Sequence, residues 1–191
     1  MGEIIKELKR ALIIFGTLAL VLGIIYPLVI TGISQVAFPY QANGEMIKVN
    51  GNIVGSALIG QSFEGPQYFQ GRPSAIDYNA STSGGSNYGP TNQKLIDRVN
   101  ETINEIKTND SLSSNATIPS DLVLASGSGL DRYISVDSAL IQVPRIAKAR
   151  NISESAINNL IQKNQETPFP WIGQPVVNVL KLNIALNGIH K

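Results

Sequence analysis

Cysteine is absent from this 191-residue chain, which excludes disulfide bonds and thiol chemistry. Histidine occurs once, at His190, and a lone histidine near a chain end is more typical of a tail than of a catalytic base. Without a second histidine, a zinc site and a Ser-His-Asp triad lack essential parts. The net charge is only +1, so there is no basic surface to favour nucleic acid. We therefore expect no catalytic residue, no metal site and no nucleic-acid partner.

Charged residues are also missing from a long segment near the N-terminus. No Asp, Glu, Lys or Arg lies between residues 11 and 44, and residues 11–37 are almost wholly apolar. A helix of about 20 apolar residues crosses a bilayer core. The sequence thus predicts a transmembrane helix over residues 11–37, after a cytoplasmic N-terminus over residues 1–10. Pro27 inside this span is interpreted either as a tolerated kink or as a shaped contact with another membrane helix.

The length and the flanks of the apolar run indicate how it is used. A signal peptide has an apolar core of about 7–15 residues, and this run is longer, so we expect an uncleaved anchor. Lys6, Lys9 and Arg10 precede the run, whereas the first basic residue after it is Lys48. Basic residues beside a span stay in the cytoplasm. The predicted localisation is the cell membrane, with a single pass, the N-terminus inside and an extracytoplasmic domain over residues 38–191.

Strand and helix signals alternate in the predicted domain. Asn50-Gly51 lies between two short β-type runs, which predicts a hairpin with a type I′ turn, and residues 57–63 are expected to extend its sheet. Residues 66–92 are rich in Gly, Pro, Ser and Asn and read as one long, ordered loop. Residues 176–186 begin like a strand and finish like a short helix. The predicted fold class is α+β, with a small sheet and several helices.

Three further helices are predicted from caps and periodicity. Thr91 can cap the first helix, whose apolar stripe is formed by Leu95, Val99, Ile103 and Ile106. Ser135 can cap the second helix, which Pro144 must kink or restart. Ser153 can cap the third helix, which is expected to end at Gln165.

Two groups of residues are candidate sites. The first is a Ser/Gly segment formed by Ser83, Gly84, Gly85 and Ser86. It resembles the core of a transporter signature that touches ATP phosphates, and it also fits a tight turn that uses the freedom of glycine at positive φ. The second group comprises polar residues set among apolar or turn residues, namely Gln61, Arg72, Gln142 and Arg145. These four either satisfy buried backbone groups or form a contact face for a partner.

Segments along nearly the whole chain resemble KdpC, the family of C subunits of the Kdp potassium-transporting ATPase. The matching segments are residues 26–28 (YPL), 38–44 (FPYQANG), 55–61 (GSALIGQ), 68–69 (YF), 71–75 (GRPSA), 83–87 (SGGSN), 128–131 (SGLD), 142–151 (QVPRIAKARN) and 172–186 (IGQPVVNVLKLNIAL). Their order, in one anchor-plus-domain layout, is far more specific than any single segment.

The resemblance implies a non-catalytic accessory subunit of a high-affinity, ATP-driven potassium uptake complex, needed for its assembly or stability. The implied partners are a channel-like potassium-binding subunit and a P-type ATPase subunit. The chain has neither the phosphorylation motif DKTGT nor a TVGYG-like filter. The family is described as a catalytic chaperone that raises the ATP affinity of the P-type subunit, and the Ser/Gly segment is its implied nucleotide contact. No cofactor of its own is implied, and ATP would act through the complex.

The charge asymmetry around the anchor conflicts with a direct nucleotide contact, because it places the Ser/Gly segment outside, where ATP is scarce. We therefore expect an indirect influence on ATP use and a domain packed on the outer face of the channel-like subunit. Two alternatives belong to other classes: a membrane-anchored extracytoplasmic binding domain, and an anchored hydrolase that works through two carboxylates. The carboxylates available for such a hydrolase are Asp77, Asp121, Asp131 and Asp137.

Overall fold

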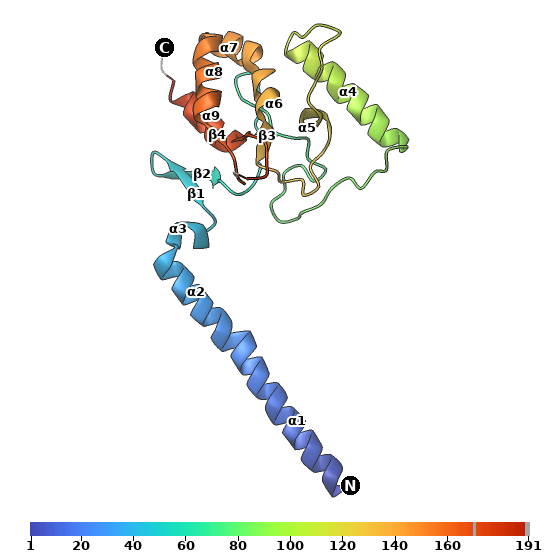
Figure 1. Cartoon of the computed structure of the whole chain (residues 1–191), viewed down its shortest axis with the longest axis vertical. Coiled ribbons are helices and arrows are strands. Elements are labelled where there is room, and N and C mark those ends of the chain that lie inside the picture. The colour runs from blue at the N-terminus through green and yellow to red at the C-terminus, as the bar shows by residue number, and fades with distance from the viewer. Residues whose placement is uncertain (170, 190–191) are drawn as a thin grey trace. The chain divides into compact units, whose positions relative to one another are not determined.

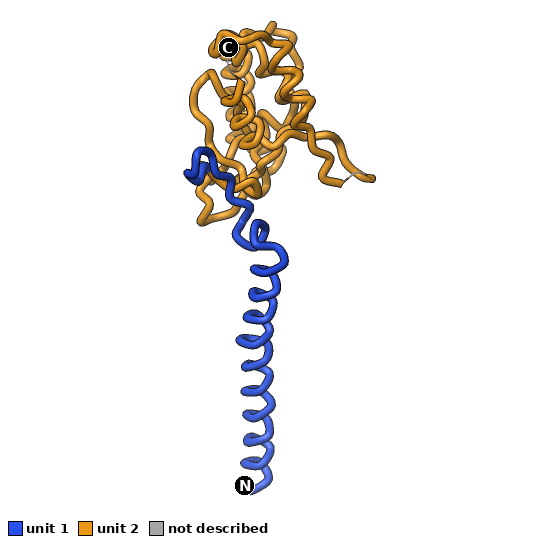
Figure 2. Tube along the Cα trace, turned by 90° about the vertical axis from the view of Figure 1, so that its left-hand side faces the viewer, with its two compact units in different colours: residues 1–54 blue, residues 55–191 orange. Residues whose placement is uncertain are grey.

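Residues 1–169 and 171–189 are described by the computed structural model of this chain (Figure 1). His190, interpreted above as a tail residue, lies outside the described residues. The chain divides into two compact units, unit 1 over Met1–Val54 and unit 2 over Gly55–Lys191 (Figure 2). Each unit is described by itself below.

Unit 1 begins with a long, continuous helical segment. It consists of α1 (Gly2–Leu20), one π-helical turn (Val21–Ile25) and α2 (Tyr26–Ala37). Together they form a helix of 36 residues that contains an 18-residue stretch with a mean hydropathy of 2.6, long and apolar enough to cross a membrane. The widened π turn ends two residues before Pro27, which has no N–H to donate and whose ring crowds the carbonyl four residues earlier. The structure therefore has an irregular turn where the sequence predicted a kink.

A short helix and a hairpin follow. Helix α3 spans Pro39–Ala42, β1 spans Met46–Val49 and β2 spans Asn52–Ser56. The connecting residues Asn50 and Gly51 have φ values of 52° and 82°, and two positive φ angles are what a type I′ turn requires. The predicted hairpin is confirmed.

The sheet does not continue beyond β2, so the prediction that residues 57–63 extend it was wrong. The chain turns after Ser56 and lays Gly60 against another loop. The Gly60 N–H donates to the Leu130 carbonyl at 2.7 Å. A Cβ at Gly60 would lie only 2.3 Å from the Asp131 carbonyl oxygen. Close approach of two backbones, which glycine permits, replaces strand pairing here.

Unit 2 contains a three-stranded antiparallel sheet in the order β3-β5-β4. Strand β3 spans Tyr133–Ser135, β4 spans Gln165–Glu166 and β5 spans Val176–Asn178. Ile134 lies opposite Val177 in the β3–β5 register, and both side chains are buried. Residues that are distant in sequence thus build one side of the core.

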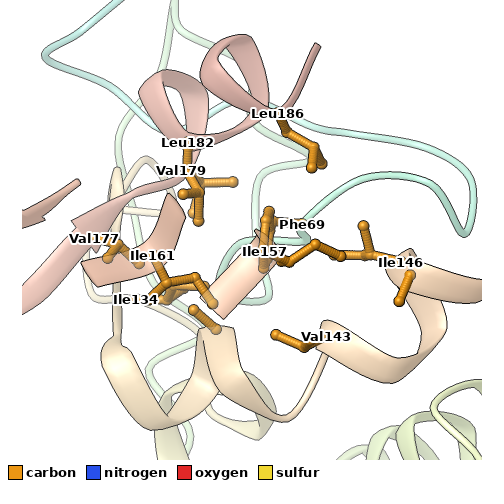
Figure 3. Packing of buried hydrophobic residues seen from close by; sticks show 12 residues of the cluster. Phe69, Ile134, Val143, Ile146, Ile157, Ile161, Val177, Val179, Leu182 and Leu186 are labelled. Carbon is orange, nitrogen blue, oxygen red and sulfur yellow. The ribbon is translucent and has the colours of Figure 1, made fainter. Parts of the chain in front are cut away.

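Helices supply the rest of unit 2. They are α4 (Gln93–Asn109), α5 (Ser120–Val123), α6 (Val136–Leu140), α7 (Val143–Arg150), α8 (Glu154–Lys163) and α9 (Val179–Asn187). In Figure 3, Phe69 of the long loop lies beside Ile157 of α8 and near Ile146 of α7. The buried apolar cluster also contains Ile134, Val143, Ile161, Val177, Val179, Leu182 and Leu186. Helix α4 is amphipathic, but it has no fully buried residue.

The helix predictions hold in outline and fail at two boundaries. Ser135 and Ser153 accept bonds from backbone N–H groups as predicted caps, and Pro144 lies in the first turn of α7, where a missing N–H is harmless. Asn92, rather than Thr91, caps α4. Helix α8 ends at Lys163, because the next residues pair with β5 as a short strand. The predicted strand and helix over residues 176–186 are confirmed as β5 and α9.

Candidate functional site

Two buried amide side chains hold the long loop of unit 2 at consecutive residues. Asn183 of α9 accepts from the Phe69 N–H at 2.8 Å and donates to the Phe69 carbonyl at 2.9 Å. Gln142 accepts from the Gln70 N–H at 2.8 Å and donates to the Gln70 carbonyl at 3.2 Å. Each amide thus acts as a strand partner would. The loop over residues 66–92 contains no strand or helix of its own, and these two amides hold its backbone in place.

A buried ion pair, between Arg145 and Asp110, holds the start of the same loop. The Arg145 Nε lies 2.6 Å from Asp110 Oδ1, and the two side chains are 7% and 5% exposed. The other guanidinium nitrogens donate to the carbonyls of Pro66 at 2.7 Å and Tyr68 at 3.0 Å, and to Gln142 Oε1 at 2.8 Å. Burial raises the pKa of Asp110, and Arg145 opposes that rise by hydrogen bonding and by its charge. Arg145 therefore joins α7, the loop and the residue that follows α4.

Among the four polar residues singled out in the sequence, Gln142 and Arg145 lie inside the domain. Their polar atoms satisfy the chain's own backbone, which is the structural interpretation given above. Arg72 is half-exposed and pairs with Asp131 at 3.0 Å. Gln61 is also half-buried, and its side chain covers Gly55, where a Cβ would lie 1.9 Å from Gln61 Oε1. The proposed partner contact through these residues stays a prediction.

A cleft of about 300 Å³ lies beside Asp110 and Gln142. Its walls come from α4 and from the long loop, and its lining includes Gln70, Arg72, Tyr78, Thr102, Glu105 and Gln142. The Tyr78 hydroxyl donates to the Arg72 carbonyl. Burial, and next the charge of Asp131, raise the pKa of Tyr78, so this hydroxyl stays protonated and remains a donor at neutral pH.

Of the four carboxylates named for a hydrolase, Asp121 and Asp131 are engaged inside the domain, whereas Asp77 and Asp137 are exposed. Asp110 lines the cleft together with Glu105, but its carboxylate is paired with Arg145. Asp121 accepts from the Ser135 N–H and from the Ser138 hydroxyl, both at 2.6 Å. Asp131 is paired with Arg72. Among the described residues, no group of three or more His, Asp or Glu side chains is arranged to hold a metal ion.

The Ser/Gly segment lies against a second glycine-containing loop, residues 126–129. The Gly84 N–H donates to the Ser128 carbonyl at 2.9 Å, and the Ser83 hydroxyl donates to the same carbonyl at 3.2 Å. A Cβ at Gly85 would lie 3.1 Å from the Gly127 carbonyl oxygen. The Gly84 N–H, a group that a phosphate would need, is thus already bonded within the chain.

Positive φ angles occur beside the Ser/Gly segment rather than within it. Asn87 has a φ of 53° and Gly129 a φ of +70°, whereas neither Gly84 nor Gly85 is among the positive-φ residues. The expectation that these two glycines serve a turn at positive φ was wrong. Gly85 is instead required for close approach to the backbone of Gly127.

Sequence reasoning missed Asp110, Asn178 and Asn183, which are all buried. Asn178 donates to the Ala57 carbonyl at 2.9 Å, so it ties the start of unit 2 to β5. A signal was available, because both asparagines, together with Lys181, interrupt an otherwise apolar run over residues 176–186. A buried amide in such a run needs a polar partner elsewhere in the fold.

Comparison with known proteins connects this architecture to one family. The family model "KdpC: K+-transporting ATPase, c chain" matches residues 8–188. A potassium-transporting ATPase KdpC subunit from Rhodopseudomonas palustris is 46% identical, over 96% of this chain and 97% of its own. A KdpC subunit from Caldanaerobacter subterraneus is 46% identical, over 97% of this chain and 95% of its own. A KdpC subunit from a Janthinobacterium species is 49% identical, over 94% of this chain and 96% of its own.

Replacement of Arg145 by Met should destabilise unit 2 by about 3–5 kcal/mol, because it leaves a buried carboxylate and two loop carbonyls unpaired. The half-exposed pair is the control, and Arg72→Met should lower the free energy of unfolding by only about 1 kcal/mol. Without Arg145 the pKa of Asp110 rises further. The loss of unfolding free energy in Arg145→Met, relative to the unaltered chain, should therefore shrink as the pH falls from neutral toward 3.8, the ordinary pKa of an aspartate. Urea unfolding at several pH values measures this, and equal losses in both variants would contradict it.

Adjacent glycines of the Ser/Gly segment should respond differently to alanine. Gly85→Ala places a methyl group against the Gly127 carbonyl and should reduce stability by about 1 kcal/mol. Gly84→Ala is the matched control, because its Cβ would meet only Ile76 Cγ2, at 4.0 Å. Thermal unfolding of the two variants tests the packing role. A larger loss in Gly84→Ala than in Gly85→Ala would show that this account of the segment is wrong.

Proposed function

Because the chain belongs to the KdpC family of K+-transporting ATPase subunits, we propose that it is the accessory subunit of an ATP-driven potassium uptake complex, needed for assembly or stability. The observation that carries the proposal is the extent of the match, which covers both the apolar helix and unit 2. Its proposed partners are a channel-like potassium-binding subunit and a P-type ATPase subunit.

The proposed role is non-catalytic. The chain has no DKTGT phosphorylation motif. The carboxylates of Asp110, Asp121 and Asp131 are held by internal donors, which leaves a two-carboxylate hydrolase without a free pair among these three. These observations favour a subunit that acts through its contacts with other chains.

The proposed orientation has the N-terminus in the cytoplasm and unit 2 outside. Lys6, Lys9 and Arg10 supply the support, since they flank the apolar run on one side only. Unit 2 then packs on the outer face of the channel-like subunit, near the point where potassium enters. In this orientation the Ser/Gly segment does not meet cytoplasmic ATP.

A catalytic-chaperone role, in which the subunit raises the ATP affinity of the P-type subunit, would then operate through the assembly. The bonded Gly84 N–H and the close packing of Gly85 support a structural use of the Ser/Gly segment. A direct nucleotide contact through Ser83, Gly84, Gly85 and Ser86 is the competing proposal.

Isolation of the complex in mild detergent tests this function. An affinity tag on the full chain should recover both partner subunits. A shortened chain that starts at Gln41 should recover them poorly, because it loses the span that we propose packs against them. The control replaces residues 11–37 by an unrelated apolar span of equal length, which keeps the membrane tether and removes the specific contacts. Recovery of the full chain without any partner would contradict the proposed function.

A further inference from the structure

Three large apolar side chains of unit 2 are far more exposed than the others. Phe169 is 72% exposed, Trp171 is 93% exposed and Ile172 is 83% exposed. The other exposed large hydrophobic residues of this unit are only 39–42% exposed, namely Leu58, Tyr88, Ile96, Leu124 and Leu140. Single exposed hydrophobic residues are ordinary, but a cluster of nearly bare ones marks a contact surface.

The three residues lie on the loop that joins β4 to β5, over residues 167–175. Pairing of Glu166 with Val176 fixes the base of this loop. Within the loop, the Ile172 N–H donates to the Phe169 carbonyl at 3.0 Å. The loop projects away from the rest of unit 2 (Figure 2). The apolar side chains are therefore presented to the surroundings and not to the core.

The loop carries no charge. Thr167 to Leu180 contains no Asp, Glu, Lys or Arg, and the charged residues at its two ends, Glu166 and Lys181, lie 2.6 Å apart as an ion pair. Because the loop has no ionic group, transfer of the loop out of water does not incur the free-energy cost of dehydrating a charge. A tryptophan with an exposed indole suits an environment that is apolar on one side and wet on the other.

Covalent attachment limits how far unit 2 can move from the bilayer. Only 17 residues separate Ala37 from Gly55, and a fully extended chain of that length spans at most about 60 Å. Aromatic side chains, tryptophan above all, gather at the membrane–water interface. The loop offers three exposed apolar side chains and no charge to this interface.

We propose that the tip of the β4–β5 loop inserts Phe169, Trp171 and Ile172 into the interfacial layer of the bilayer that holds the apolar helix. The loop is a second, reversible membrane contact that restrains unit 2 beside its anchor. It requires only a lipid surface on the side of the membrane where unit 2 lies, so it is independent of the proposed orientation.

Trp171 is the only tryptophan of the chain, so its fluorescence reports on this loop alone. The full chain is reconstituted in vesicles whose lipids carry bromine on their acyl chains, and again in unbrominated vesicles. Insertion predicts a blue-shifted emission in both, with intensity lost only beside the brominated lipid. It also predicts protection from aqueous iodide.

Two double variants keep Trp171 and test its neighbours. Phe169→Ser/Ile172→Ser should weaken the quenching by brominated lipid and leave the thermal unfolding temperature unchanged, because these side chains pack against nothing in the core. Ile96→Ser/Leu140→Ser is the matched control, since those residues are 40% and 41% exposed elsewhere on unit 2, and its quenching should equal that of the unaltered chain. Free access of iodide to Trp171 in vesicles would overturn the proposal. Protection that appears only with the partner subunits, without quenching by lipid, would also overturn it and assign the loop to a protein contact.

Discussion

The buried ion pair between Arg145 and Asp110 is the contact on which the order of unit 2 most depends. A charge removed from water without a partner is strongly destabilising, so each of the two side chains requires the other. Arg145 uses its remaining donors on the carbonyls of Pro66 and Tyr68. One side chain thereby joins α7, the residue after α4 and the start of the long loop. Gln142 and Asn183 then hold the next part of that loop by its backbone.

Local signals in the sequence predicted the local elements of the fold. The Asn50-Gly51 turn, the caps at Ser135 and Ser153 and the restart at Pro144 depend on neighbouring residues only, and they were found. The strand β4 was missed, because its two residues are strands only through pairing with β5. The ion pair was missed for the same reason, since Asp110 and Arg145 are 35 residues apart and nothing local connects them.

Most of the residues that were candidate site residues in the sequence instead hold the domain's own backbone in place. Gln142 and Arg145 support a loop, and Gly85 allows two backbones to approach. Membership of the KdpC family makes the chain a subunit of a K+-transporting ATPase.

The account depends on which side of the membrane unit 2 occupies. The absence of cysteine makes a direct measurement available, because any introduced cysteine is unique. Lys148→Cys places one on the exposed side of α7, and Glu3→Cys places one on the N-terminal flank; both positions are exposed. Intact cells are treated with a membrane-impermeant maleimide. The account predicts that Lys148→Cys is labelled directly and that Glu3→Cys is labelled only after the cells are opened. Labelling of Glu3→Cys alone in intact cells would contradict it and would place the Ser/Gly segment on the side where ATP is found.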